Sequence, residues 1–220
     1  MPPAVTVRPV LSDLTFCADE IPLLTAEAAL PCWKSRRSRR FERYYRACAA
    51  AFANDCRCRI FPQAERLYRQ ALETAQSLPQ WHAQLRTVLT FQTADTVSLY
   101  TETSLTGCPS RSVFRRSDTW DLRRGLPLRL QELFPPRTAW RSLLLQTAAQ
   151  QIEEAHAQGI ALYDPGWRKQ LRRCFDPHCF YLTGEGLCFF YPLCSIAPAV
   201  EGLPTFFLPY HEQAGPFRPQ

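Results

Sequence analysis

The sequence predicts an α+β fold in which an antiparallel sheet, a meander plus a C-terminal hairpin, packs against one long helix and an N-terminal helical pair. Three features support this prediction: a helical period over residues 34–79, a period of two from Trp81 to Asp121, and a hairpin signal over residues 180–191. Hydrophobic residues make up 46% of the 220 residues and aromatic residues 12%, so the chain can bury a sizeable core.

The first 79 residues are expected to precede the main domain. Residues 1–33 are rich in proline and predict an N-terminal extension that can hold one strand, Ile21–Leu30. Residues 34–79 predict a basic amphipathic helical lead-in, because apolar residues recur at i, i+3 and i+4 on both sides of Pro62. Pro62 either kinks one long helix or begins a second helix at its first turn, and we favour two helical segments in line.

Three strands are expected next, over Leu85–Phe91, Val97–Thr103 and Val113–Asp121. Each shows alternating side chains, and short connections join them, which is typical of an antiparallel meander. A turn at Gly125 follows, and a long helix is predicted over Ala139–Gln158, before Gly159.

The C-terminal segment carries the clearest strand signals. Phe180–Thr183 and Leu187–Tyr191 are apolar runs that flank a three-residue connection with two glycines, which predicts a β-hairpin. A last extended run covers Thr205–Tyr210. The α+β domain is therefore expected to span residues 80–212, followed by a flexible tail at 213–220.

Three motifs in this order resemble a known family. Asp121–Phe134 follows the pattern D-L-x-x-G-x-x-L-x-L-x-x-L-F, Phe180–Leu187 follows F-Y-[IL]-T…G-L, and Ile196–Gly202 follows I-A-P-x-x-x-G. Together with the order of elements, they resemble the RsiV-type C-terminal domain, which a lysozyme-sensing anti-sigma factor shares with PdaC-like peptidoglycan deacetylases. The resemblance covers roughly residues 85–210, and Ser104–Pro109 lacks the histidine that the family often carries there.

The resemblance implies a non-catalytic recognition domain whose partner is a lysozyme-like protein or another cell-envelope component, in an accessory protein of a Gram-positive bacterium. Loops on a rigid sheet usually carry such binding sites. We expect the site where Thr106-Gly107 meets the loop at residues 195–198. The candidate binding residues are Thr106, Gly107, Ser195, Ile196, Ala197 and Pro198.

An alternative function follows from the net charge of +6 and from the arginines at the start of the helical lead-in. An arginine-rich helix with interleaved aromatic residues can bind nucleic acid or an acidic partner inside the cell. The members of this candidate basic patch are Arg36, Arg37, Arg39, Arg40 and Arg43. A solvated helix face is the simpler interpretation of the same pattern.

Neither a catalytic site nor a metal or cofactor site is predicted. The ten cysteines lack the paired spacing of a zinc ribbon, and none of the four histidines is marked as the partner of a nucleophilic cysteine. The chain also lacks the G-x-G-x-x-G, Walker A and G-x-S-x-G motifs. Since we find neither a signal peptide nor a run of about 18 apolar residues, we expect a cytoplasmic protein with reduced thiols. The resemblance implies an extracytoplasmic one.

Overall fold

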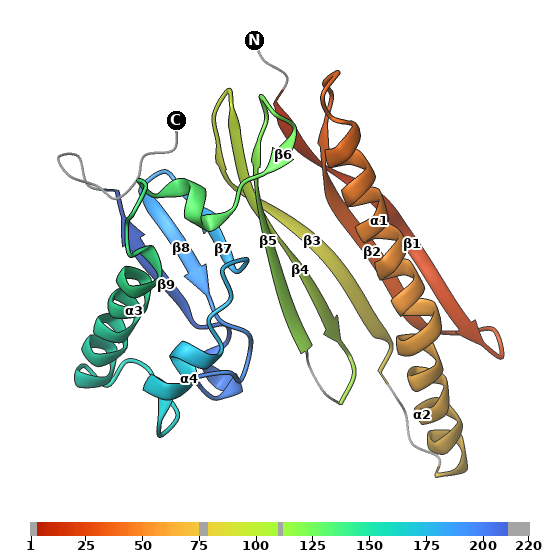
Figure 1. The fold of residues 1–220 in the computed structure, drawn as a ribbon. Helices are drawn as coiled ribbons and strands as arrows, with labels where there is room; N and C mark the ends of the chain where they lie inside the picture. The colour runs from red at the N-terminus through yellow and green to blue at the C-terminus, as the bar shows by residue number, and fades with distance from the viewer. Residues whose placement is uncertain (1–3, 75–78, 110–111, 211–220) are drawn as a thin grey trace. The chain divides into compact units, whose positions relative to one another are not determined.

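The computed structural model describes residues 4–74, 79–109 and 112–210, and the expected tail at 213–220 lies outside them (Figure 1). The chain divides into two compact units. Unit 1 comprises Met1–Val88 and Thr101–Arg115, and unit 2 comprises Leu89–Tyr100 and Arg116–Gln220. The mixed α+β class predicted from the sequence is confirmed.

Unit 1 begins with a hairpin of two long antiparallel strands, β1 (Val5–Ala18) and β2 (Ile21–Trp33). The predicted strand at 21–30 is thus confirmed, whereas β1 was not predicted. Several register shifts interrupt the pairing of β1 with β2, so its side chains do not keep one strict alternation. The turn residues Asp19 and Glu20 adopt left-handed φ angles of 50° and 65°, which the usual turn residues glycine and asparagine would adopt more easily.

The helical lead-in is one uninterrupted helical rod rather than a helix with a kink. It consists of α1 (Arg39–Asp55), a π-helical turn (Cys56–Ile60) and α2 (Phe61–Glu73). Pro62 lies in the first turn of α2, where its missing N–H is tolerated. Helix is found on both sides of Pro62 as predicted, but the two predicted segments join into one long helix.

Aromatic contacts hold this rod against the hairpin. Phe41 of α1 packs edge-on against Trp33 of β2, and Phe61 of α2 stacks on Phe16 of β1. Figure 1 shows α1 and α2 running along these two strands. The amphipathic pattern read from the sequence therefore marks the face that packs on the sheet.

The helical rod connects two neighbouring parallel strands, β2 and β3 (Trp81–Gln92), in a β–α–β crossover. The parallel pair is a difference from the fully antiparallel sheet that was expected. Its register sets Leu24 beside Trp81 and Thr25 beside His82. Because successive side chains of a strand point to opposite faces, Leu24 and Trp81 are buried on the helix side, while His82 lies exposed on the open face.

The remaining strands complete two sheets instead of the single sheet expected. The six-stranded sheet has the order β1-β2-β3-β4-β5-β6, and the C-terminal hairpin forms a separate three-stranded sheet with the order β7-β8-β9. Strands β3, β4 and β5 contribute residues to both units. The further bounds are β4 (Thr96–Thr106), β5 (Ser112–Asp121), β6 (Leu126–Pro127), β7 (Phe180–Leu182), β8 (Gly186–Phe190) and β9 (Thr205–Pro209).

In unit 2 the predicted long helix is confirmed as α3 (Trp140–Ala157), and a short helix α4 (Trp167–Arg173) follows it. The side-chain amide of Gln151 donates to the carbonyl of Phe207 at 2.6 Å and accepts from the N–H of Phe207 at 3.1 Å, which fixes α3 against β9. Leucine and aromatic side chains of α3, α4 and the three-stranded sheet form one core.

Buried hydroxyl groups satisfy the backbone of β7. The hydroxyl of Ser98 accepts from the N–H of Leu182 at 2.8 Å, and that of Ser117 accepts from the N–H of Phe180 at 3.0 Å. Thr119 hydrogen-bonds to Ser98 at 2.7 Å. Backbone groups that the hairpin would otherwise bury without partners are therefore paired. Among the described residues, no helix is both long and apolar enough to cross a membrane.

Candidate binding sites

The structure places the C-terminal group of predicted binding residues partly in the core of unit 2. Ile196 is 0% and Ala197 is 1% exposed. Ser195 donates a hydrogen bond to the carbonyl of Pro192 at 2.6 Å, and the N–H of Asp164 donates to the carbonyl of Ile196 at 3.1 Å. The I-A-P motif thus has a structural role here, since it anchors the loop from inside.

The other two predicted residues lie in unit 1, at the end of β4. Thr106 is exposed, and Gly107 has a φ of +77°. A Cβ on Gly107 would overlap the carbonyl oxygen of Gln80, so glycine is needed for the backbone conformation as well as for the close approach. Because residues 106–107 and 195–198 belong to different units, their joint site stays a prediction.

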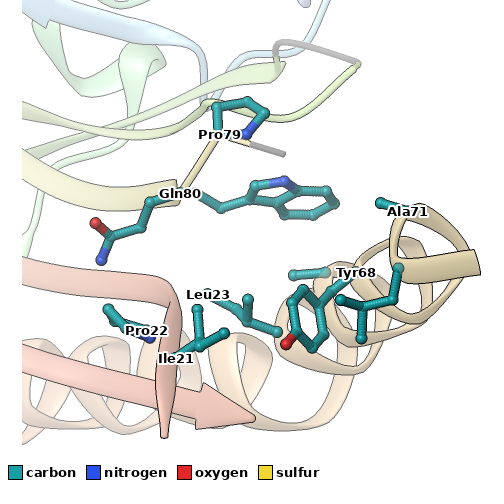
Figure 2. Close-up of a pocket in the computed structure, with 10 residues that line it drawn as sticks. Ile21, Pro22, Leu23, Tyr68, Ala71, Pro79 and Gln80 are labelled. Carbon is teal, nitrogen blue, oxygen red and sulfur yellow. The ribbon is translucent and has the colours of Figure 1, made fainter. Parts of the chain in front are cut away.

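Unit 1 contains a hollow of ≈270 Å³ that was not predicted from the sequence (Figure 2). We call it the apolar hollow because most of its lining residues are apolar, although polar and apolar atoms contribute similar shares of its exposed lining surface. In Figure 2, Ile21 and Leu23 line one side and Pro79 and Gln80 line the opposite side, while Tyr68 of α2 lies at one end. The complete lining is Ile21, Pro22, Leu23, Ala64, Tyr68, Ala71, Leu72, Pro79, Gln80 and Trp81. Small side chains on α2 leave this space open between the helix and the sheet.

The rim of the apolar hollow combines exposed apolar side chains with negative charge. Ile21 is 45% exposed and Leu72 is 59% exposed, although both are large and apolar. The β1–β2 turn directly before Ile21 carries Asp19 and Glu20, both exposed. The pKa of Arg69 is raised chiefly by its hydrogen bond to Glu65, and the negative charge of Asp19 adds to this effect, so the acidic turn acts on α2. Exposed apolar groups beside a hollow are typical of a site that binds a partner.

A second hollow of ≈410 Å³ lies on the open face of the β2–β3 pair. We call it the polar hollow because most of its lining residues are polar, although apolar atoms contribute more than half of its exposed lining surface. Its polar lining residues are Thr25, Glu27, His82, Gln84, Ser104 and the predicted residue Thr106. The alternation of polar residues along β3 was visible in the sequence. The neighbouring strand β4 was expected from the predicted meander, but the pairing with β2 was not, because parallel pairing across a helical crossover has no local signal.

The predicted basic patch lies at the start of α1 and in the turn before it, and all five of its arginines are exposed. Ser38 precedes the helix without a capping side-chain hydrogen bond. Among the described residues, Arg36, Arg39, Arg40 and Arg43 have no carboxylate within ion-pair distance, although other arginines such as Arg59 do. Their charges add to the positive end of the helix dipole.

Two of the thiols have raised pKa values. Burial raises the pKa of Cys56 to about 11, and burial together with Asp176 raises the pKa of Cys179 to about 12. Protonated thiols are poor nucleophiles and poor metal ligands. Within residues 4–74, 79–109 and 112–210, we find no group of three His, Cys, Asp or Glu side chains placed to hold a metal ion.

Comparison with known proteins identifies relatives of this fold. A family model described as Protein of unknown function (DUF3298) matches residues 131–211. A solved DUF3298 family protein from Pseudomonas aeruginosa is similar with a TM-score of 0.59 and 19% identity, over 94% of this chain and 92% of that chain. A solved DUF3298 family member from Bacteroides fragilis is similar with a TM-score of 0.57 and 13% identity, over 95% of this chain and 92% of that one.

No curated protein matches the chain. At these identities, the likeness to solved structures shows the fold alone. The chain is thus an α+β protein whose residues 131–211 match a DUF3298 domain and whose fold resembles solved DUF3298 proteins. That this domain is of the RsiV type stays a prediction.

Proposed function

We propose that this protein is a non-catalytic recognition domain that binds a basic protein of the cell envelope, of the lysozyme-like kind that the resemblance to the RsiV-type domain implies. The observation that carries the proposal is the apolar hollow of unit 1 with Ile21 and Leu72 exposed on its rim. A hollow of ≈270 Å³ is smaller than the range of about 300–1,000 Å³ usual for small-molecule sites. It is the size of a pocket that takes one large side chain of a protein partner.

Charge supports a basic partner. Asp19 and Glu20 stand next to Ile21 on the rim, and Glu73 is exposed at the end of α2 after Leu72. Acidic groups around an apolar pocket favour a partner that presents lysine or arginine around an apolar anchor.

The side chains in the two hollows support recognition rather than catalysis. The closest approach to a nucleophile–base pair is Thr25, whose hydroxyl lies 2.7 Å from Nδ1 of His82. A catalytic histidine is normally oriented by a third group on its other ring nitrogen. Among the described residues, we find no such group bonded to His82.

The test is the binding of a chicken-type lysozyme to the purified chain by calorimetry. We expect saturable binding that weakens with added salt. Leu72→Lys should weaken it at least about tenfold, because the substitution removes an apolar group from the rim and adds a charge of the same sign as the partner's. The matched control is Leu162→Lys in unit 2, since Leu162 is 63% exposed and Leu72 is 59% exposed. Equal losses in both variants, or no binding by the wild type, would reject the proposal.

A second candidate function is binding of a phosphate-rich polymer or acidic partner through the basic patch. Arg39 and Arg43 lie on the helix face opposite the buried Phe41, and Arg36 lies in the turn before α1. None of the three has a carboxylate partner among the described residues. We expect Arg39→Gln with Arg43→Gln to reduce the slope of log K against log salt for an oligonucleotide by about one per arginine. The control is the double substitution Arg172→Gln with Arg173→Gln, which changes an exposed pair on α4. Oligonucleotide binding that does not depend on salt would contradict this function.

A further inference from the structure

The polar hollow on the open face of unit 1 has ordered side chains and a neutral balance of donors and acceptors. The hydroxyl of Thr25 is 2.7 Å from Nδ1 of His82, and the side-chain amide of Gln84 donates to the carboxylate of Glu27. Both pairs join β2 to β3 at neighbouring register positions, so they fix each other's orientation. The hollow is thus pre-organised without a ligand, which lowers the entropic cost of binding.

Two hydroxyl groups remain available on the adjacent strand β4. Ser104 and Thr106 line the same hollow, and among the described residues neither hydroxyl group has a hydrogen-bond partner. Hydroxyl groups both donate and accept, as do the amide of Gln84 and, in its neutral form, the imidazole of His82. The lining therefore offers several two-way hydrogen-bonding groups within ≈410 Å³.

The same lining disfavours other classes of ligand. No lysine or arginine is among the lining residues, so an anion has no counter-charge. Apolar atoms contribute more than half of the exposed lining surface, which suits the carbon-bound face of a sugar ring. A purely hydrophobic ligand would find no leucine, isoleucine, valine, phenylalanine, tyrosine or tryptophan side chain there. The single carboxylate, Glu27, already accepts the hydrogen bond of Gln84, and it is too few for a divalent cation.

We propose that this hollow binds a neutral saccharide of one or two rings, whose hydroxyl groups hydrogen-bond to Ser104, Thr106, Gln84 and Glu27. The volume lies within the range of small-molecule sites. The site lies on the face of the β2–β3 pair that His82 occupies, whereas the apolar hollow is lined by Trp81. Because the lining has no aromatic side chain on which a sugar ring could stack, the Kd is in the range of about 1–10 mM.

The experiment is protein-observed NMR of the intact chain, titrated with maltose and with N,N′-diacetylchitobiose up to about 20 mM. We expect saturable shifts that are confined to residues around Thr25, Gln84 and Thr106. Thr106→Val and Gln84→Ala should each weaken binding about fivefold, which corresponds to one lost hydrogen bond. The matched control, Thr6→Val on β1, changes an exposed threonine outside the hollow and should bind as the wild type does.

Glucose 6-phosphate is the comparator for charge, and we expect it to bind no more tightly than maltose. The amide spectrum of each variant shows whether it is folded before its affinity is judged. The proposal is overturned if neither sugar shifts the wild-type spectrum, if the shifts lie elsewhere, or if folded Thr106→Val and Gln84→Ala bind like Thr6→Val. Leu72→Lys should leave sugar binding unchanged, so that failure here and failure of the proposed protein binding are distinguishable.

Discussion

Units 1 and 2 fill the space between helix and sheet with side chains of different size. Unit 2 packs leucine, isoleucine and aromatic residues of α3 and the three-stranded sheet into a sealed core, where Leu187 and Ile152 are 0% exposed. Unit 1 also buries large side chains such as Trp33 and Phe41, but around its apolar hollow α2 presents the small side chains of Ala64 and Ala71. Small side chains leave a hollow where larger neighbouring side chains hold the helix and the sheet apart. The binding surfaces that we propose therefore lie in unit 1, whereas the core of unit 2 is filled.

The largest expected effect compares two leucines. Leu187→Ala removes a fully buried side chain of unit 2 and should reduce the free energy of unfolding by about 2–5 kcal/mol. Leu72→Ala removes a side chain of unit 1 that is 59% exposed, and it should change the free energy of unfolding by about 0.5 kcal/mol or less. Urea denaturation of both variants measures the two values. Equal losses would mean that the exposed rim of the hollow is part of the core.

The next comparison enlarges one alanine in each unit. Ala148→Leu on α3 overfills the core of unit 2, where Ala148 is 0% exposed, and should cost about 1–3 kcal/mol of unfolding free energy. Ala71→Leu on α2 projects into the apolar hollow, so it should be tolerated within about 0.5 kcal/mol. Both positions lie within helices, so the change in helix propensity from alanine to leucine is the same for the two variants. A large loss for Ala71→Leu, measured by thermal unfolding, would contradict an open hollow.

Two serines of the same strand, β4, give a smaller contrast. Ser98→Ala leaves the buried N–H of Leu182 without its acceptor and should reduce the unfolding free energy by about 1–2 kcal/mol. Ser104→Ala removes a hydroxyl that has no partner among the described residues and should be close to neutral. Chemical denaturation measures both. Faster hydrogen exchange of the Leu182 amide in Ser98→Ala alone is the second readout, and unchanged exchange would refute the role of Ser98.

The smallest effect depends on pH. The pKa of Glu132 is lowered from its usual 4.5, first by the hydrogen bond from the N–H of Arg129 and then by the charges of Arg129 and Arg124. A carboxyl group with a lowered folded-state pKa stabilises the fold above its unfolded pKa, and this contribution is lost as the pH falls through the folded pKa. Glu132→Gln should therefore cost about 0.5 kcal/mol or less at pH 7, and nothing at acidic pH. Glu73→Gln in unit 1 is the control. An effect of Glu132→Gln on the unfolding free energy that does not change with pH would contradict the lowered pKa of Glu132.

The sequence predicts those parts of the fold that have local signals. The hairpin of β7 and β8 is marked by its glycine-containing turn, α3 by its helical period, and β3 by strict alternation. Strand β1 was missed because its register shifts break the alternation and because Asp19-Glu20 is not a usual hairpin turn. The division into two sheets was missed as well, since it depends on which distant strands pair.

The candidate sites were less predictable than the fold for the same reason. Thr106 was selected from the sequence as a loop residue beside a strand and does line the polar hollow. Ile196 and Ala197 were selected by the motif that they belong to, yet they lie in the core. Neither hollow has a sequence signature, because each depends on the size of side chains that β2, α2, β3 and β4 bring together from distant positions.

The most direct test of the central claim is calorimetric titration of the wild type and of Ala71→Leu with a chicken-type lysozyme. If the apolar hollow receives a side chain of the partner, the wild type binds and Ala71→Leu loses at least about tenfold in affinity while its Tm stays unchanged. Wild-type affinity in a folded Ala71→Leu variant, or no binding by the wild type, would contradict recognition through unit 1.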